Sequence, residues 1–162
     1  MGYTTEFEGH FNVTPPFTSE QVKYLKKFST TRRVKRDSAE TQKREDPARE
    51  AVGLPVGPQG GYFVGETGFF GQNQGPDVRD SNAPPEGQPG LWCGWEASDD
   101  GSRIQWDGGE KFYAYATWLE YIVEHFLKPW GRTISGEVYW YGEDHDDRGR
   151  IVVDKNRIRC VP

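Results

Sequence analysis

GLWCGWEASDDGSRIQWDGGEKFYAYATWLEYIVEHFLKPW, from Gly90 to Trp130, is the stretch that decides the fold. Its first part alternates apolar and polar residues over positions 91–97, and again over positions 103–107, as half-buried strands do. Residues 98–102 between them read SDDGS, which is typical of a tight turn because glycine and aspartate suit its backbone. The stretch therefore predicts a β-hairpin.

After Gly109 the period changes, and apolar residues recur every three or four positions, which indicates an amphipathic helix. The residues of this stripe are Phe112, Tyr115, Ala116, Leu119, Ile122, Val123 and Phe126. Asp107 or Gly109 is the predicted N-cap, and Pro129 is predicted to end the helix after Lys128. An aromatic stripe of this kind favours core packing over a cofactor site, so we expect no cofactor.

Length and composition suit one domain spanning residues 1–162. Aromatic residues make up 14% of the chain while all apolar residues make up only 34%, which predicts a small core of large rings. The net charge of −5 disfavours general affinity for nucleic acids or anionic membranes. Without a signal-peptide pattern or a long apolar run, we expect a cytoplasmic protein that makes no membrane contact. In that compartment Cys93 and Cys160, at inward strand positions, are expected to be buried free thiols.

The remaining elements complete an α+β pattern. Strands are predicted at residues 4–13 and 134–141, and a closing hairpin has strands at 151–153 and 157–161. A helix is predicted to start after Thr18, because Gln21 stands three residues later in a capping box. Together these elements predict a two-layer sandwich, with two amphipathic helices on one face of an antiparallel or mixed sheet, as a ferredoxin-like variant.

Two polar segments interrupt this pattern. Residues 29–59 are rich in both charges and poor in apolar residues, which predicts a mobile excursion with a helical extension over Thr31–Arg36. Residues 60–71 predict one short strand near Tyr62–Val64, followed by Phe69 and Phe70. Residues 72–89 are rich in glycine and proline and predict a long loop.

The polar face of the predicted sheet is the main candidate binding surface. Its proposed binding residues are His10, Trp92, Glu96, Arg103, Glu137, Tyr139 and Tyr141, with Glu6, Glu8 and Gln105 beside them. Aromatic residues on open sheets bind bases in RNA-recognition modules, but there they are surrounded by Lys and Arg. With four Glu and one Arg, this face is expected to attract a basic peptide or protein surface and to disfavour nucleic acid. The alternative is a solvated sheet face, or one covered by the 72–89 loop.

The acidic turn at residues 143–147 is a second candidate site. Glu143, Asp144, His145 and Asp146 offer ligands for Mg²⁺ or Mn²⁺. As a calcium loop the turn fails, because Arg148, Val152 and Lys155 occupy ligand positions. An exposed hairpin turn is the alternative.

The basic run Arg32, Arg33, Lys35 and Arg36 is the one feature that favours nucleic acid, although acidic residues follow it. Solvated charge is the alternative. Paired histidine or cysteine ligand spacings and the glycine-rich phosphate-binding patterns do not occur in the sequence, so we predict no catalytic residue.

Three short motifs carry a resemblance: GLWC at Gly90–Cys93, WDGGEKF at Trp106–Phe112, and GED followed by DRG within Gly142–Gly149. The chain resembles a family of small uncharacterised proteins of tailed phages and of bacteria that carry phage genes. The resemblance covers the first strand and helix and most of residues 90–161. It implies no enzymatic activity and no catalytic residues, but it implies an accessory role, such as disabling a host factor or sequestering a signalling nucleotide.

We therefore expect a non-enzymatic binding protein, phage-encoded, that engages a host protein or sequesters a small ligand. The first alternative is a metal-dependent hydrolase or nuclease that uses the acidic turn. The second is a nucleic-acid binder that uses the basic run. The sequence leaves the oligomeric state open.

Overall fold

The computed structural model describes residues 2–65 and 75–162 and gives a mixed α+β protein. The chain forms two compact units, each described here by itself. The sheet unit comprises Met1–Val22 and Gly94–Pro162, and the insert unit comprises Lys23–Cys93. Helix α1 (Ser19–Thr30) runs across the boundary. Whether the two units make up one domain, as the sequence predicts, stays a prediction.

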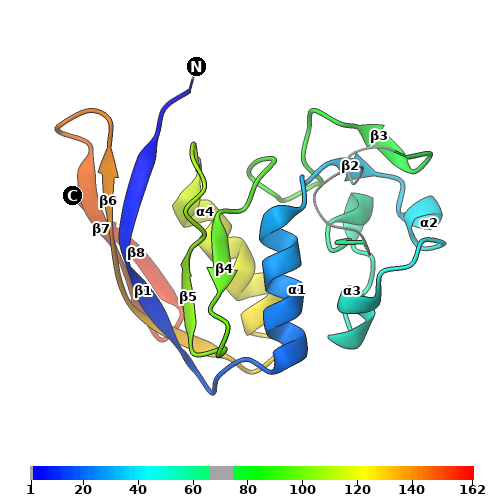
Figure 1. Ribbon diagram of the computed structural model, residues 1–162, viewed down its shortest axis with the longest axis horizontal. Coiled ribbons are helices and arrows are strands. Elements are labelled where there is room, and N and C mark those ends of the chain that lie inside the picture. Colours follow the sequence, from blue (N-terminus) through cyan, green and yellow to red (C-terminus); the bar gives the residue numbers. More distant parts are fainter. Residues whose placement is uncertain (1, 66–74) are drawn as a thin grey trace. The chain divides into compact units, whose positions relative to one another are not determined.

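The sheet unit contains a six-stranded sheet of order β4-β5-β1-β6-β7-β8, in which each neighbouring pair is antiparallel (Figure 1). Its strands are β1 (Thr5–Thr14), β4 (Trp95–Ala97), β5 (Arg103–Trp106), β6 (Thr133–Gly142), β7 (Arg148–Asp154) and β8 (Arg157–Val161). The two predicted hairpins are confirmed as β4–β5 and β7–β8. The first of these strands is shorter than predicted, because only its last three residues pair.

Aromatic rings fill the core between the sheet and helix α4 (Tyr115–Ile122), which continues as a π-helical turn over Val123–Leu127. Helix α4 contacts both β4 and β8, so it spans one face of the sheet. Phe7 is a hub of this core, with ring centroids 5.5 Å from Trp95 and 5.0 Å from Tyr115. A core built from large rings was predicted, and it is confirmed.

Helix α4 begins five residues later than predicted from Gly109 as the N-cap, and seven residues later than predicted from Asp107. Ala114, its N-cap, has the left-handed backbone angles φ 54° and ψ 38°, and the preceding residues are not helical. Phe112 explains the difference, since its ring is 3% exposed and lies 5.6 Å from Phe7 and 5.4 Å from Trp95. The backbone leaves the helical path to bring this ring into the core. Tertiary packing here outweighs the local helical pattern, and the periodicity of the sequence does not reveal it.

The start of α1 follows the prediction. The Gln21 backbone N–H donates to Thr18 Oγ1 at 3.2 Å, and the Thr18 backbone N–H donates to Gln21 Oε1 at 3.0 Å. This reciprocal pair satisfies two amide groups at the helix start that have no partner within the helix. The predicted capping box is confirmed.

The insert unit is built from short elements. They are β2 (Lys35–Arg36), α2 (Ser38–Thr41), α3 (Pro47–Ala51), a 3₁₀ turn (Pro58–Gly60) and β3 (Val78–Asp80), with β2 and β3 antiparallel. The helical extension predicted over 31–36 is wrong, because β2 lies there, and the predicted 72–89 loop contains β3. Phe69, Phe70 and residues 72–74 lie outside the described residues.

The strand predicted within residues 60–71 does not form at Tyr62–Val64, and residues 66–71 lie outside the described residues. The Val64 and Gly65 backbone N–H groups donate to the carboxylate of Asp46, at 3.3 Å and 2.8 Å, and not to a neighbouring strand. Asp46 is fully buried and also accepts from Arg49 Nε at 2.7 Å. A charged side chain therefore satisfies the backbone groups that a strand would otherwise pair.

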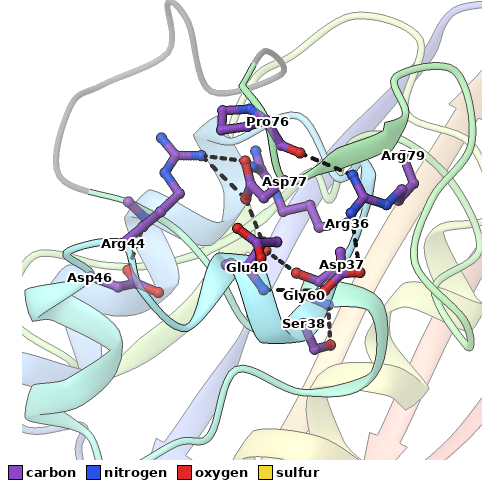
Figure 2. Close-up of polar contacts among 12 residues, drawn as sticks. Arg36, Asp37, Ser38, Glu40, Arg44, Asp46, Gly60, Pro76, Asp77 and Arg79 are labelled. Atoms are coloured by element: carbon purple, nitrogen blue, oxygen red, sulfur yellow. Dashed lines mark hydrogen bonds and ion pairs between the residues drawn. The ribbon is translucent and has the colours of Figure 1, made fainter.

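A buried charge cluster stabilises the segment that the sequence predicts to be an excursion (Figure 2). Asp77, which is 1% exposed, accepts from Arg36 at 2.8 Å, Arg44 at 3.1 Å and the Thr41 hydroxyl at 2.8 Å. Both guanidinium groups also lie over the Phe63 ring, at 4.5 Å and 4.8 Å from its centroid. Ion pairs and cation–π contacts thus take the place of part of an apolar core. The mobility of residues 29–59 stays a prediction.

The two cysteines are both free thiols, in different settings. Cys93 is buried, as predicted. Cys160 is exposed, so the prediction of a buried thiol is wrong there. It lies on β8, the edge strand of the sheet, which has a neighbouring strand on one side only.

Candidate functional site

Two rows of side chains cross the sheet on the face that points away from α4. The strand register places Glu6 opposite Tyr141 and Tyr141 opposite Arg148, and it repeats the order with Glu8, Tyr139 and Arg150. We call these two sets the Glu–Tyr–Arg rows. The intervening residues of β6, such as Val138 and Trp140, are buried on the opposite side. Strand alternation therefore presents both rows to solvent.

A shallow cavity of about 430 Å³ lies at the tyrosine–arginine end of the rows. It is lined by Tyr139, Tyr141, Arg148, Gly149, Arg150, Val161 and Pro162. The Tyr139 side chain is 42% exposed, which is unusual for so large a ring. The floor is tightly packed, because a Cβ atom at Gly149 would lie 2.6 Å from the Val161 carbonyl oxygen.

Polar contacts hold the rows in place without burying their charges. Arg150 Nη1 donates to Glu137 Oε1 at 3.2 Å, and both side chains are 41% exposed. The Tyr139 hydroxyl also donates to Glu137, at 3.3 Å, and the Tyr141 hydroxyl donates to Glu8 at 3.2 Å. Partial burial raises the pKa of the Tyr141 hydroxyl, and the hydrogen bond to Glu8 adds to this rise, so Tyr141 stays neutral near pH 7.

Arg148 is held more loosely than Arg150. Its guanidinium lies 5.6 Å from the centroid of the Tyr141 ring, within the range of a cation–π contact. In the part of the chain that the structure describes, it forms no ion pair with a carboxylate. Its charge is therefore accessible to a ligand.

The charge balance of this face differs from the one read from the sequence. Strand β7 begins at Arg148, so Arg148 and Arg150 belong to the sheet and not to the acidic turn. On β8, Arg159 lies opposite Val152 and Arg157 lies opposite Asp154, which places both on the same face. The count of four Glu and one Arg is therefore incomplete, and the expectation that this face disfavours nucleic acid stays a prediction. The sequence does contain an indication of this arrangement. Ile151 and Val153 are apolar and buried, so strand alternation makes Arg148 and Arg150 point outward.

The other residues of the predicted surface are distributed unevenly. His10 lies opposite Glu137 and so borders the rows. Glu96, whose carboxylate accepts from Gln105 at 3.1 Å, and Arg103, opposite Asn12, lie toward the β4 edge of the sheet. Trp92 lies outside the strands and belongs to the insert unit. The structure thus brings together Glu137, Tyr139, Tyr141 and His10, but not the whole predicted set.

The acidic turn serves as a hairpin connection between β6 and β7. Asp147 organises it, because its carboxylate accepts from the Tyr3 hydroxyl at 2.7 Å and from Trp140 Nε1 at 3.0 Å. Glu143 accepts from the Thr4 backbone N–H at 2.9 Å. Within residues 2–65 and 75–162, no three His, Cys, Asp or Glu side chains are grouped so that they could hold a metal ion. Glu143, Asp144, His145 and Asp146 therefore do not form the predicted ligand set.

The basic run is divided between surface and interior. Arg33 and Arg36 are 2% and 3% exposed, and Arg33 Nη2 donates to the Gly61 carbonyl oxygen at 2.7 Å. Arg32 and Lys35 keep partial exposure. The expectation of four solvated charges is wrong at Arg33 and Arg36, because both side chains are used inside the insert unit.

Comparison of the chain with protein-family models, curated proteins and solved structures gives no match. None of the helices in the described residues has the length and apolar character needed to cross a bilayer. The function must therefore be inferred from the chemistry of the site itself.

Proposed function

We propose that this protein is a non-enzymatic binding protein that engages its partner through the Glu–Tyr–Arg rows. The observation that carries the proposal is the exposed Tyr139 ring beside Arg148 and Arg150 in a cavity of about 430 Å³. Tyrosine and arginine are enriched where proteins bind partners, because they combine a large contact area with directional hydrogen bonds. A host protein and a small ligand are the two kinds of partner proposed from the sequence.

The resemblance to phage proteins supports an accessory role, in which the protein binds a host component and catalyses no reaction. The two alternatives are weaker. The acidic turn is occupied by hydrogen bonds to Tyr3 and Thr4, which does not favour a metal-dependent hydrolase. The burial of Arg33 and Arg36 removes half of the basic run from any nucleic-acid surface.

We also propose a ferredoxin-like variant for the sheet unit. Its elements occur along the chain as β1, α1, β4, β5, α4 and β6, and the matching strands have the order β4-β5-β1-β6. A central first strand flanked by the third and fourth strands of a βαββαβ chain is what this topology requires. The β7–β8 hairpin then extends the sheet beside β6 and supplies the arginines of the rows.

Affinity capture from a bacterial lysate, followed by mass spectrometry and nucleotide analysis, tests the binding function. Three tagged forms are compared: the wild type, the double variant Tyr139→Ala/Tyr141→Ala, and Tyr113→Ala. Tyr113 is 53% exposed and lies outside the rows, so it is a matched control for loss of a surface ring. A partner retained by the wild type and the control but lost from the double variant supports the proposal. Equal capture by all three forms, or capture of nothing, contradicts it.

A further inference from the structure

The chemical groups follow the same order across the sheet in both Glu–Tyr–Arg rows. Carboxylates lie on β1, aromatic rings on β6 and guanidinium groups on β7, in the same order in both rows. Neighbouring strands are about 4.8 Å apart, so each row extends roughly 10 Å across the sheet. Successive rows are two residues apart along each strand, which corresponds to about 7 Å.

A nucleotide has the same order of groups: hydrogen-bond donors on the edge of the base, a flat ring, and a phosphate. We infer that this face binds single-stranded nucleic acid, with bases on Tyr139 and Tyr141 and phosphates at Arg148 and Arg150. Base edges that carry amino groups then point toward Glu6 and Glu8. This inference rests on the proposed binding function, and for the same rows it replaces the host protein or small ligand with a nucleic-acid partner.

Each residue type in the rows can bind one part of a nucleotide. Exposed tyrosine rings stack on bases of any sequence, because every base has a flat face. Arginine forms paired hydrogen bonds with phosphate oxygens, and Arg148 has no ion pair to exchange within the described chain. Carboxylates accept hydrogen bonds from exocyclic amino groups, such as N4 of cytosine. The rows therefore favour cytosine over thymine, which lacks such a group.

The acidic residues of the face do not prevent phosphate binding. Glu6 and Glu8 lie two strands from the arginines, roughly 10 Å, which exceeds the Debye length of about 8 Å at physiological ionic strength. Glu137 pairs with Arg150, but both side chains are 41% exposed, and exposed pairs are weak enough to be exchanged. An acidic peptide fits less well, because its carboxylates would be repelled by Glu6 and Glu8.

Fluorescence anisotropy with short fluorescein-labelled oligodeoxycytidine and oligothymidine, added to the full chain, tests the inference. We expect the cytidine probe to bind more tightly, and Tyr139→Ala to weaken its binding by about tenfold. Arg148→Glu is expected to weaken it by about tenfold or more, whereas Arg103→Glu, the same charge change near the β4 edge, changes it little. With two phosphate contacts, a plot of log affinity against log salt concentration should have a slope of about −1.4. Arg148→Ala removes one contact and should make this slope shallower by about 0.7.

Two further measurements separate the outcomes. Glu8→Gln should reduce the preference for cytidine while binding persists, and matching oligoribonucleotides distinguish RNA from DNA. The inference is overturned if no oligonucleotide binds, if Arg148→Glu and Arg103→Glu weaken binding equally, or if an oligoglutamate peptide binds more tightly than the oligonucleotides. If the oligonucleotides fail while a lysate partner still depends on Tyr139 and Tyr141, the nucleic-acid inference fails and the binding function stands.

Discussion

Each unit contains an ion pair between an arginine and a carboxylate, and the two pairs differ in burial. In the insert unit, Arg36 and Asp77 meet at 2.8 Å with side chains 2% and 1% exposed. In the sheet unit, Arg150 and Glu137 meet at 3.2 Å with both side chains 41% exposed. Removing one partner of a buried pair leaves an uncompensated charge in the interior, whereas an exposed pair can exchange its partner for water or a ligand. Burial thus decides which arginines stabilise the fold and which can bind a ligand.

The largest effect is expected from Asp77→Ala, which leaves the buried Arg36 and the half-exposed Arg44 without their carboxylate. Loss of one partner from a buried pair costs about 3–5 kcal/mol. Urea unfolding followed by circular dichroism measures the loss, and hydrogen exchange at the Glu40 amide locates it in the insert unit. The matched control is Glu40→Gln, which breaks the exposed pair with Lys43 and should cost about 0.5 kcal/mol or less. If both variants lost the same free energy of unfolding, burial would not explain how strongly an ion pair stabilises this protein.

The same cluster predicts a dependence of stability on pH. Burial alone would raise the pKa of the Asp77 carboxyl, but hydrogen bonds from Arg36 and Thr41 and the charges of both arginines outweigh burial and lower this pKa. A lowered folded-state pKa stabilises the protein above the unfolded value, near 3.8, and this contribution is lost as pH falls through the folded pKa. The stability difference between wild type and Asp77→Asn should therefore shrink below about pH 4. A difference that stays constant from neutral to acidic pH contradicts this assignment.

A smaller effect is expected from Gly149→Ala, beneath the binding rows. The new Cβ would lie 2.6 Å from the Val161 carbonyl oxygen and would also clash with the end of the Trp140 ring. Overpacking of this kind costs about 1–3 kcal/mol and should also displace β8 from β7. Thermal unfolding measures the cost, and probe binding should weaken with it. Unchanged stability would mean that the floor of the cavity is less rigid than the packing indicates.

The smallest effect on stability, about 0.5 kcal/mol or less, is expected from Glu137→Gln. The substitution removes a negative charge and releases Arg150 from its ion pair. Affinity for the oligodeoxycytidine probe should therefore increase while the unfolding transition stays in place. A loss of affinity would indicate that Glu137 positions Arg150 and does not compete for it.

Much of the sheet unit could be predicted because its signals are local. Alternation along β1 and β6 identified both strands and put Tyr139, Tyr141 and Glu137 on one face. The insert unit could not be predicted in this way, because its stability depends on partners far apart in sequence, such as Arg36 with Asp77 and Asp46 with Gly65. A charge-rich composition is ambiguous between a solvated segment and a buried ion-pair cluster until those partners are known.

The candidate site was predicted in part for a similar reason. The tyrosines lie in a long, regular strand, but Arg148 and Arg150 fall between the acidic turn and the strand predicted at 151–153, so they were not placed in the sheet. The only indication that β7 starts as early as Arg148 is that Ile151 and Val153, at alternate positions, both point inward. The surface charge of a sheet thus depends on where its strands begin, which is the least certain part of a sequence-based assignment.

The position of β1 has a consequence for synthesis. Its ladder with β6 joins Thr14 to Thr133, and the chain between them includes the whole insert unit. At about 5–20 residues per second, a ribosome needs roughly 6–24 s to make that intervening segment. During this time β1 can pair only with β5, through the short ladder at Phe11 and Asn12, and the side chain of Phe7 lies beyond that ladder. The central strand of the sheet is therefore made first, and its longest ladder can form only after most of the chain has been made.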